Sequence, residues 1–124
     1  MPSLPDGCTL VELRSVGSTN DEARDRAQSG ATDGTVIWAR EQTAGRGRRG
    51  RDWSSPVGNL YTSTILRPDR PAGEAAQLSL VAAVALAEAL DTVLPAEAEI
   101  ACKWPNDILV DGKKIAGILL ESQG

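Results

Sequence analysis

The alternation of apolar and polar residues along the chain predicts several short strands and two helices. Residues 10–16 and 35–41 are rich in β-branched and other apolar side chains, and residues 59–66 alternate in part, so each segment is a predicted strand. Between residues 74 and 93 apolar side chains recur at intervals of three and four, which predicts a long helix. Its helically spaced positions are Leu78, Ala82, Ala85, Leu86, Ala89 and Leu90.

Turn-forming residues divide the C-terminal part of the chain. Residues 99–103 form a predicted strand, and the sequence Trp-Pro-Asn-Asp at 104–107 is typical of a turn. Asp111-Gly112 lies between two apolar runs, a pattern that predicts a two-residue type I′ turn. We therefore expect residues 108–120 to form a β-hairpin.

A second helix is predicted from about Asn20 to Gln28, ending at Gly30. Thr19 and Glu22 have the spacing of a capping box, which satisfies two backbone N–H groups at a helix start. The simplest interpretation makes residues 18–20 only a helix cap. The alternative is that their hydroxyls and N–H groups form a polar pocket for a ligand carbonyl or carboxylate.

The loop that follows the second predicted strand is strongly cationic. Residues 42–53 read Gln-Thr-Ala-Gly-Arg-Gly-Arg-Arg-Gly-Arg-Asp-Trp, with four arginines and three glycines. Taken alone, this loop is a solvated basic segment or an RNA-binding segment. The loop 42–58 is longer than ordinary connections, and loops of that length are usually functional lids or disordered. Because the arginines repel one another and the glycines add chain entropy, we expect residues 43–53 to be poorly ordered without a ligand.

Composition narrows the function. The 124 residues carry a net charge of −4, so a local cationic site suggests a small anionic ligand rather than a nucleic-acid face. Histidine is absent, which excludes Ser-His and Cys-His catalysis and the usual metal sites. The two cysteines, Cys8 and Cys102, stand alone, as expected in the reducing cytoplasm. We expect no membrane partner, because the chain has no run of 18 apolar residues.

Arginine and lysine could activate a carboxylic acid with ATP, because that reaction needs charge neutralisation rather than a base. Mg²⁺ would be held mainly by phosphates, with Asp107 the best-placed carboxylate. Trp53 either stacks on an adenine or anchors the loop, whereas Trp104 is expected in the core. The candidate cations are Arg46, Arg48, Arg51, Lys103 and Lys114.

Four motifs carry a resemblance to a known family. The loop 42–53 resembles the adenylate-binding loop of biotin protein ligases, and Ser18-Thr19-Asn20 resembles their biotin-binding segment. Lys-Trp-Pro-Asn-Asp at 103–107 and Lys-Lys-Ile-Ala-Gly-Ile at 113–118 are similar to later motifs of that family. The four occur in the family's order and span nearly the whole chain.

The resemblance implies an α+β fold with a mixed, largely antiparallel sheet and helices packed on one face, like class II aminoacyl-tRNA synthetases. It implies a ligase that forms a C–N bond: biotin is activated with ATP and Mg²⁺ to biotinyl-5′-AMP. Biotin is then transferred to a lysine of a biotin carboxyl carrier domain of acetyl-CoA carboxylase or a related carboxylase. A homodimer is compatible with this expectation.

The resemblance also implies site residues, which fall into overlapping sets. Biotin contacts are expected from Ser18, Thr19, Asn20, Gln42, Gly45, Arg46, Gly47, Arg48 and Lys114. ATP and adenylate contacts are expected from Arg48, Arg51, Trp53, Lys103, Asn106 and Asp107. The catalytic residues would be Arg48, Lys103 and Lys114, and the weak Mg²⁺ ligand would be Asp107.

The chain departs from the family at both ends. The Ser-Thr-Asn motif begins at residue 18, which leaves no room for a helix-turn-helix domain, so we expect a monofunctional ligase without DNA binding. The family's catalytic domain continues beyond the equivalent of Gly124 and ends in a small β-barrel. We therefore expect residues 1–124 to be the N-terminal portion of that domain, with the sheet incomplete.

Three alternatives stay open. A lipoate ligase or lipoyl/octanoyl transferase would share the fold, although the arginine-rich loop and residues 103–107 favour biotin. An RNA-binding module could use Arg46 to Arg51, but aromatic residues make up only 3% of the chain. The third alternative is an inactive fragment that keeps the biotin pocket.

Overall fold

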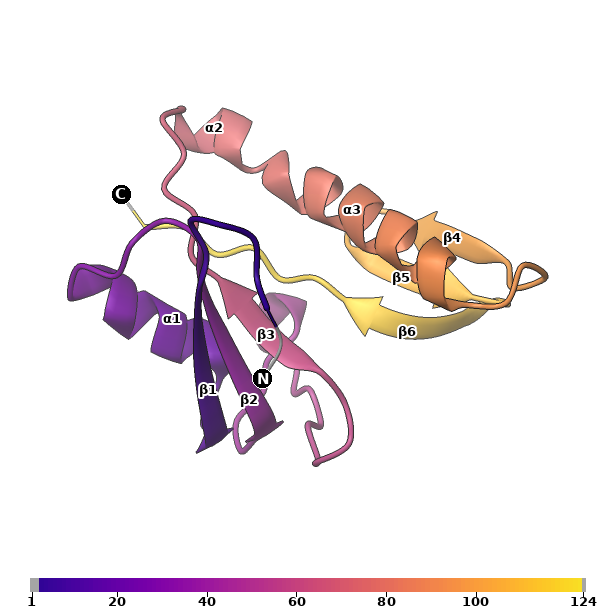
Figure 1. Cartoon of the computed structure of the whole chain (residues 1–124), viewed down its shortest axis with the longest axis horizontal. Coiled ribbons are helices and arrows are strands. Elements are labelled where there is room, and N and C mark those ends of the chain that lie inside the picture. Colours follow the sequence, from indigo (N-terminus) through magenta and orange to yellow (C-terminus); the bar gives the residue numbers. More distant parts are fainter. Residues whose placement is uncertain (1–2, 124) are drawn as a thin grey trace. The chain divides into compact units, whose positions relative to one another are not determined.

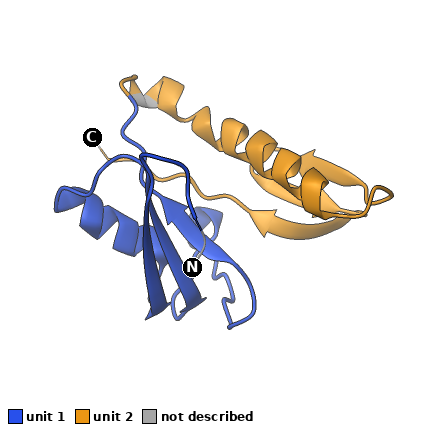
Figure 2. Cartoon of the chain, viewed as in Figure 1, with its two compact units in different colours: residues 1–68 blue, residues 69–124 orange. Residues whose placement is uncertain are grey.

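The computed structural model describes residues 3–123, apart from the side chain of Ala72. The chain divides into two compact units with the boundary between Pro68 and Asp69 (Figure 2). Each unit has its own three-stranded sheet.

The first unit is a mixed sheet with one helix (Figure 1). Its elements are β1 (Thr9–Val16), α1 (Thr19–Gln28), β2 (Thr35–Gln42) and β3 (Tyr61–Thr64). Strand β1 runs parallel to β2 and β3 runs antiparallel to it, in the order β1-β2-β3. Helix α1 is the crossover that parallel pairing requires. The three predicted strands are confirmed, although β3 is shorter than residues 59–66.

A small apolar core holds α1 against this sheet. Ile37 of β2 is fully buried, and Ala23 of α1 and Ile65 lie beside it. Burial of one such side chain contributes about 1.5–3 kcal/mol. The partly buried residues that pack against this core are Val11, Leu13, Ala27 and Ala31.

The start of α1 differs from the predicted capping box by one residue. The N-cap is Ser18, whose backbone is extended (φ −152°, ψ 134°) and whose hydroxyl accepts a hydrogen bond from the Asp21 N–H at 3.4 Å. Thr19 is therefore the first helical residue, and its N–H bonds to Gln42 instead. The prediction of Thr19 as the cap was wrong because Ser18 offers an equivalent hydroxyl three residues before Asp21. The predicted end is confirmed, because Gly30 has a φ of +98° directly after the C-cap Ser29.

The second unit is an antiparallel sheet with a long helix. Its strands are β4 (Ile100–Lys103), β5 (Asp107–Val110) and β6 (Lys113–Gly117), in the order β4-β5-β6, and α3 (Leu78–Val93) contacts β4 and β5. The predicted Asp-Gly turn is confirmed, because Asp111 and Gly112 both have positive φ values, 51° and 79°. The predicted α+β class and the largely antiparallel pairing are thus correct, but the strands form two sheets.

The predicted helix from residue 74 to 93 is interrupted near its start. A short helix α2 (Ala72–Ala75) ends before α3 begins at Leu78. The N–H groups of Gln77, Ser79 and Leu80 bond to carbonyls three residues earlier, so this turn is tighter than an α-helix. The Ser79 hydroxyl also donates to the Ala76 carbonyl at 3.3 Å, so a side chain competes with backbone N–H groups for this carbonyl. The spacing of apolar residues does not reveal this competition.

One helical stretch among the described residues, Gly73–Val93, is long and apolar enough to cross a membrane by length and composition. The core helix of a soluble protein meets the same criterion, so this finding alone favours neither environment.

Arg67 should stabilise the first unit by closing the end of α1. Its guanidinium donates from Nη2 to the carbonyls of Ala27 and Ala31, both at 2.7 Å, and its backbone N–H donates to Asp33 at 2.6 Å. We expect Arg67→Ala to lower the free energy of unfolding by about 1 kcal/mol, because exposed charged hydrogen bonds are partly screened.

Arg70→Ala is the matched control, because among residues 3–123 the Arg70 side chain makes only an exposed ion pair with Glu74 at 3.4 Å. Urea denaturation should show a loss below about 0.5 kcal/mol for this variant. Equal losses for the two variants would contradict a capping role for Arg67.

Candidate functional site

The start of α1 and the end of β2 meet at a half-buried amide, that of Gln42. Gln42, the last residue of β2, accepts from the Thr19 N–H at 2.8 Å and from the Thr19 hydroxyl at 3.2 Å through Oε1. The parallel register causes this contact, because it sets Val16 beside Gln42 and α1 begins three residues after Val16. The carboxyl ends of adjacent parallel strands are a common place for ligand sites.

Buried hydroxyls surround this amide. Ser18, Thr19, Ser55 and Ser63 are between 4% and 8% exposed. The Ser63 hydroxyl lies 2.7 Å from the Thr19 hydroxyl and also contacts the Asn20 amide. Since Ser63 has one proton, it can donate to only one of these two neighbours. The cluster is polar and buried, and hydrogen bonds connect Thr19, Gln42, Ser55 and Ser63 within it, as expected of a prepared recognition site.

Sequence reasoning missed Ser55 and Ser63. One signal for Ser63 was present: it follows Tyr61 and precedes Ile65 on the buried face of the β3 segment, where an apolar residue is expected. A polar residue in such an alternation indicates a specific hydrogen-bond partner. Ser55 lies between exposed loop residues, so only the folded structure identifies it.

The first part of the cationic loop is fixed by backbone hydrogen bonds. The N–H groups of Thr43 and Ala44 donate to the carbonyls of Val16 and Gly17 at 2.9 and 2.7 Å. Trp53 N–H donates to the Gly45 carbonyl at 2.9 Å, which brings the two ends of residues 45–53 together. A short 3₁₀ turn, η1 (Arg48–Gly50), forms the tip. The predicted mobility of this loop stays a prediction.

The arginines of the loop differ in their partners. Arg46 Nη2 pairs with the Asp21 carboxylate of α1 at 2.5 Å, which directs this guanidinium toward the helix start. Arg48, Arg49 and Arg51 are exposed, and among the described residues their side chains have no hydrogen bond or ion pair. Three exposed guanidinium groups on the loop that borders the polar cluster are therefore available to an anionic ligand.

The two tryptophans assigned above lie in different environments. Trp53 is 36% exposed and lies 3.6 Å, through Cε3, from the position that a Gly47 Cβ would take. The stacking of Trp53 on an adenine therefore stays a prediction. Trp104 is 76% exposed, so its prediction as a core residue was wrong. Trp104 lies in the turn after β4 and is not part of a strand, so the alternation of strand side chains does not direct it toward the core.

The remaining predicted residues gather at the start of β5 in the second unit. Lys114 Nζ lies 3.1 Å from Asp107 Oδ1, and Lys103 faces Asp107 in the β4–β5 register. Asn106 is 9% exposed and donates to the Ile118 carbonyl at 2.6 Å. The predicted site residues thus form two sets, one in each unit.

The carboxylates provide few ligands for a metal ion. Within residues 3–123, no group of three or more Asp, Glu, Cys or His side chains could hold one. Asp107 already pairs with Lys114, so this cluster offers a single, partly neutralised carboxylate. Such a set suits Mg²⁺ only where ligand phosphates supply most of the coordination.

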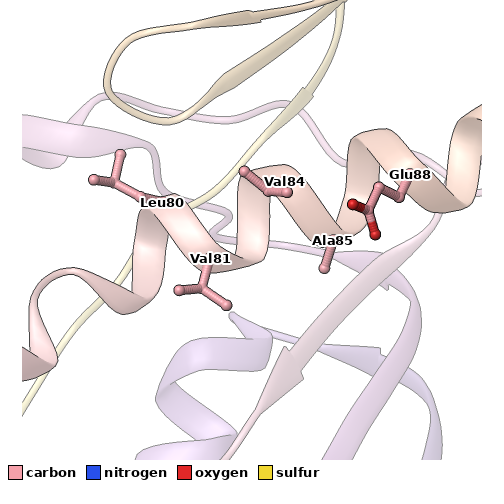
Figure 3. Close-up of a pocket in the computed structure, with 5 residues that line it drawn as sticks. All are labelled: Leu80, Val81, Val84, Ala85 and Glu88. Atoms are coloured by element: carbon pink, nitrogen blue, oxygen red, sulfur yellow. The ribbon is translucent and has the colours of Figure 1, made fainter.

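A shallow depression on α3 is apolar and differs from both sets. Leu80, Val81, Val84, Ala85 and Glu88 line it (Figure 3). Val81 and Val84 are 61% and 54% exposed, and the single charged group is a carboxylate. Because no cation or hydroxyl lines this depression, it does not suit a carboxylate or phosphate ligand.

Comparison with known proteins gives a consistent result. The model of the biotin/lipoate A/B protein ligase family matches residues 12–124. The chain is 52% identical over 112 residues to biotin--[acetyl-CoA-carboxylase] ligase of Paracoccus denitrificans. The aligned region covers 90% of this chain and 46% of the relative.

Two solved structures are also similar. The biotin protein ligase of Leishmania major in complex with biotinyl-5-AMP superposes with a TM-score of 0.81 at 36% identity, covering 98% of this chain and 54% of that one. The biotin protein ligase of Aquifex aeolicus in complex with biotin and ATP gives 0.79 at 37% identity, covering 92% and 47%. These similarities confirm the predicted fold, and the chain spans about half the length of each of the three proteins.

Gly45 should be essential to the loop because a side chain does not fit there. A Cβ at Gly45 would lie 2.5 Å from both the Ser55 hydroxyl and the Trp53 carbonyl oxygen. We expect Gly45→Ala to reduce stability by about 1–3 kcal/mol, because the backbone has to move.

Gly47→Ala is the control in the same loop, because its Cβ would meet nothing closer than 3.6 Å and its φ is −101°. Its stability should change by less than about 0.5 kcal/mol in the same denaturation experiment. An unchanged Gly45→Ala variant would refute the close packing at this position.

Proposed function

This chain belongs to the biotin/lipoate A/B protein ligase family, and from that premise we propose that residues 1–124 form part of the catalytic domain of an ATP-dependent biotin protein ligase. In the proposed reaction, the biotin carboxylate attacks the α-phosphorus of ATP and releases pyrophosphate. The resulting biotinyl-5′-AMP is attacked by the amine of an acceptor lysine, which loses a proton as the amide forms and AMP leaves.

The observation that carries the proposal is a buried polar cluster beside a cationic loop. The Ser18 hydroxyl accepts one hydrogen bond, and no acceptor for its own proton lies among the described residues. Gln42 Nε2 donates one of its two hydrogens to Ser55, and the other has no acceptor among those residues. A ligand with polar groups at one end and a carboxylate at the other would satisfy both the cluster and the arginines.

The proposal assigns biotin binding to Ser18, Thr19, Asn20, Gln42, Gly45, Arg46, Gly47, Arg48 and Lys114. The cluster would orient the ligand. Arg46, held by Asp21, and Arg48, which has no partner among the described residues, would neutralise the carboxylate and adenylate. Neutralisation is what two reacting anions require, and no general base is needed because biotin is ionised near neutral pH.

Adenylate binding is assigned to Arg48, Arg51, Trp53, Lys103, Asn106 and Asp107, with Lys103 and Lys114 adding positive charge at the phosphates. Mg²⁺ bound with ATP would neutralise phosphate charge, and Asp107 is the residue that would hold it. The ion pair between Asp107 and Lys114 supports a shared electrostatic role for these two residues.

The proposed partners are biotin and a carrier domain of acetyl-CoA carboxylase or a related carboxylase. The Paracoccus denitrificans relative is named for the acetyl-CoA-carboxylase acceptor. We place the protein in the cytoplasm, without DNA or membrane as partner, and a homodimer is compatible with the proposal. Two exposed free cysteines, Cys8 and Cys102, support a reducing compartment.

Binding of biotin rather than lipoate tests the proposed function. In calorimetry the chain should bind biotin with micromolar or tighter affinity, and Mg-ATP should strengthen the binding. The reason is that the ureido group of biotin can bond to the hydroxyl cluster, whereas the dithiolane of lipoate cannot. Equal heats for biotin and lipoate would reject the biotin assignment.

Arg48 should retain the adenylate. Loss of a charged hydrogen-bond donor from an exposed loop costs about 1.5–3 kcal/mol of affinity, or roughly ten- to a hundredfold faster release. We therefore expect Arg48→Gly to release biotinyl-5′-AMP faster than the unmodified chain in a stopped-flow displacement experiment.

Arg49→Gly is the matched control. It removes the same charge from the neighbouring position, where a φ of 61° makes glycine favourable. Its release rate should stay within about threefold of the unmodified chain, which is under 1 kcal/mol. Equal acceleration by both substitutions would show that net loop charge, and not Arg48 itself, retains the intermediate.

A further inference from the structure

Ser55 is a buried hydroxyl in an exposed stretch of loop. It is 6% exposed, whereas its neighbours Ser54 and Pro56 are exposed. Burial of a hydroxyl is unfavourable unless it forms hydrogen bonds. The environment of Ser55 therefore indicates a specific role that its position in the sequence does not.

The Ser55 hydroxyl both donates and accepts a hydrogen bond. It donates its one proton to the Trp53 carbonyl at 2.8 Å and accepts from Gln42 Nε2 at 3.0 Å. The backbones of Ser55 and Gln42 are also joined, because the Gln42 N–H donates to the Ser55 carbonyl at 3.1 Å. Two contacts between the same pair of residues restrict both the position and the rotation of the Gln42 side chain.

These bonds fix which end of the Gln42 amide faces which neighbour. The Thr19 backbone N–H can only donate, so the oxygen of Gln42 must face Thr19. Ser55 has given its proton to Trp53, so it needs a donor from Gln42, which only the NH₂ group supplies. Both requirements give the same orientation, without ambiguity between oxygen and nitrogen.

Close packing leaves little freedom around Ser55. A Cβ at Gly45 would lie 2.5 Å from the Ser55 hydroxyl and 2.9 Å from Gln42 Nε2. The Gly45 backbone thus closes one side of the hydrogen-bonded pair. Neither side chain can rotate away without loss of a bond.

We propose that Ser55 is a positioning residue that orients the Gln42 amide and ties the end of the arginine loop to the polar cluster around Gln42. A continuous path of hydrogen bonds, Thr19–Gln42–Ser55–Trp53, joins the start of α1 to Trp53, two residues after the last arginine of the loop. This inference rests on the proposed function, because it assigns Ser55 to the affinity of that same site for biotin.

Without the Ser55 hydroxyl, Gln42 Nε2 loses its acceptor, and only the two hydrogen bonds that Oε1 accepts from Thr19 still restrain the amide. Part of the binding free energy of the ligand would then be used to fix the orientation of the amide. The loss of one well-placed hydrogen bond corresponds to about a tenfold weaker affinity. Ser55 itself does not have to touch the ligand for this effect.

The test compares Ser55→Ala with Ser54→Ala, the same substitution at the exposed neighbour. Biotin affinity is measured by calorimetry on the whole chain, and hydrogen exchange of the Gln42 side-chain NH₂ is measured by NMR. Ser55→Ala should weaken biotin binding about tenfold and accelerate NH₂ exchange, because the acceptor is gone. Ser54→Ala should change neither, and Ser55→Thr, which keeps the hydroxyl, should retain most of the biotin affinity and of the slow NH₂ exchange.

If Ser55→Ala does not fold, Ser55→Cys serves in its place, because a thiol keeps the volume but bonds only weakly. The same biotin affinity, or the same Gln42 exchange rate, in the Ser55 and Ser54 variants would overturn the proposal. If the unmodified chain does not bind biotin, the proposed function fails, and the Gln42 exchange rates alone decide the role of Ser55.

Discussion

The Gln42 amide is the contact on which the rest of the first unit depends. Its oxygen accepts from the first residue of α1, and its nitrogen donates to Ser55 at the far end of the loop. An unpaired amide at this part-buried position would lower the free energy of unfolding by about 1–3 kcal/mol. The start of α1, the end of β2 and the loop therefore have to be in place at the same time. The parallel pairing of β1 with β2 makes this possible, because α1 begins directly beside the end of β2.

Charge is distributed around this contact in a way that suits two anions. The chain has a net charge of −4, yet three arginines at the loop tip have no partner among the described residues. Arg46 differs, because its ion pair with Asp21 holds its guanidinium at the start of α1. The acidic body limits general attraction to polyanions, while the local cations can stabilise charge that develops on a bound carboxylate and phosphate.

Local patterns predicted the elements well and the tertiary contacts poorly. The Asp111-Gly112 turn and the glycine after α1 follow from backbone conformations that few residues adopt, so sequence alone identifies them. The cap at Ser18, the break before Leu78 and the exposure of Trp104 depend on competition between nearby hydrogen bonds or on the position of a turn. Ser55 and Ser63 were missed because their partners lie 13 and 44 residues away along the chain.

The central claim is that the ligand binds where α1, β2 and the cationic loop meet. An NMR titration of the ¹⁵N-labelled chain with biotin tests it most directly, because each backbone amide reports separately. The account predicts that the largest shifts fall on residues 18–20 and 42–48, and that the amides of α3 near Val81 and Val84 stay unchanged. Shifts concentrated on α3, or spread evenly over the chain, would contradict it.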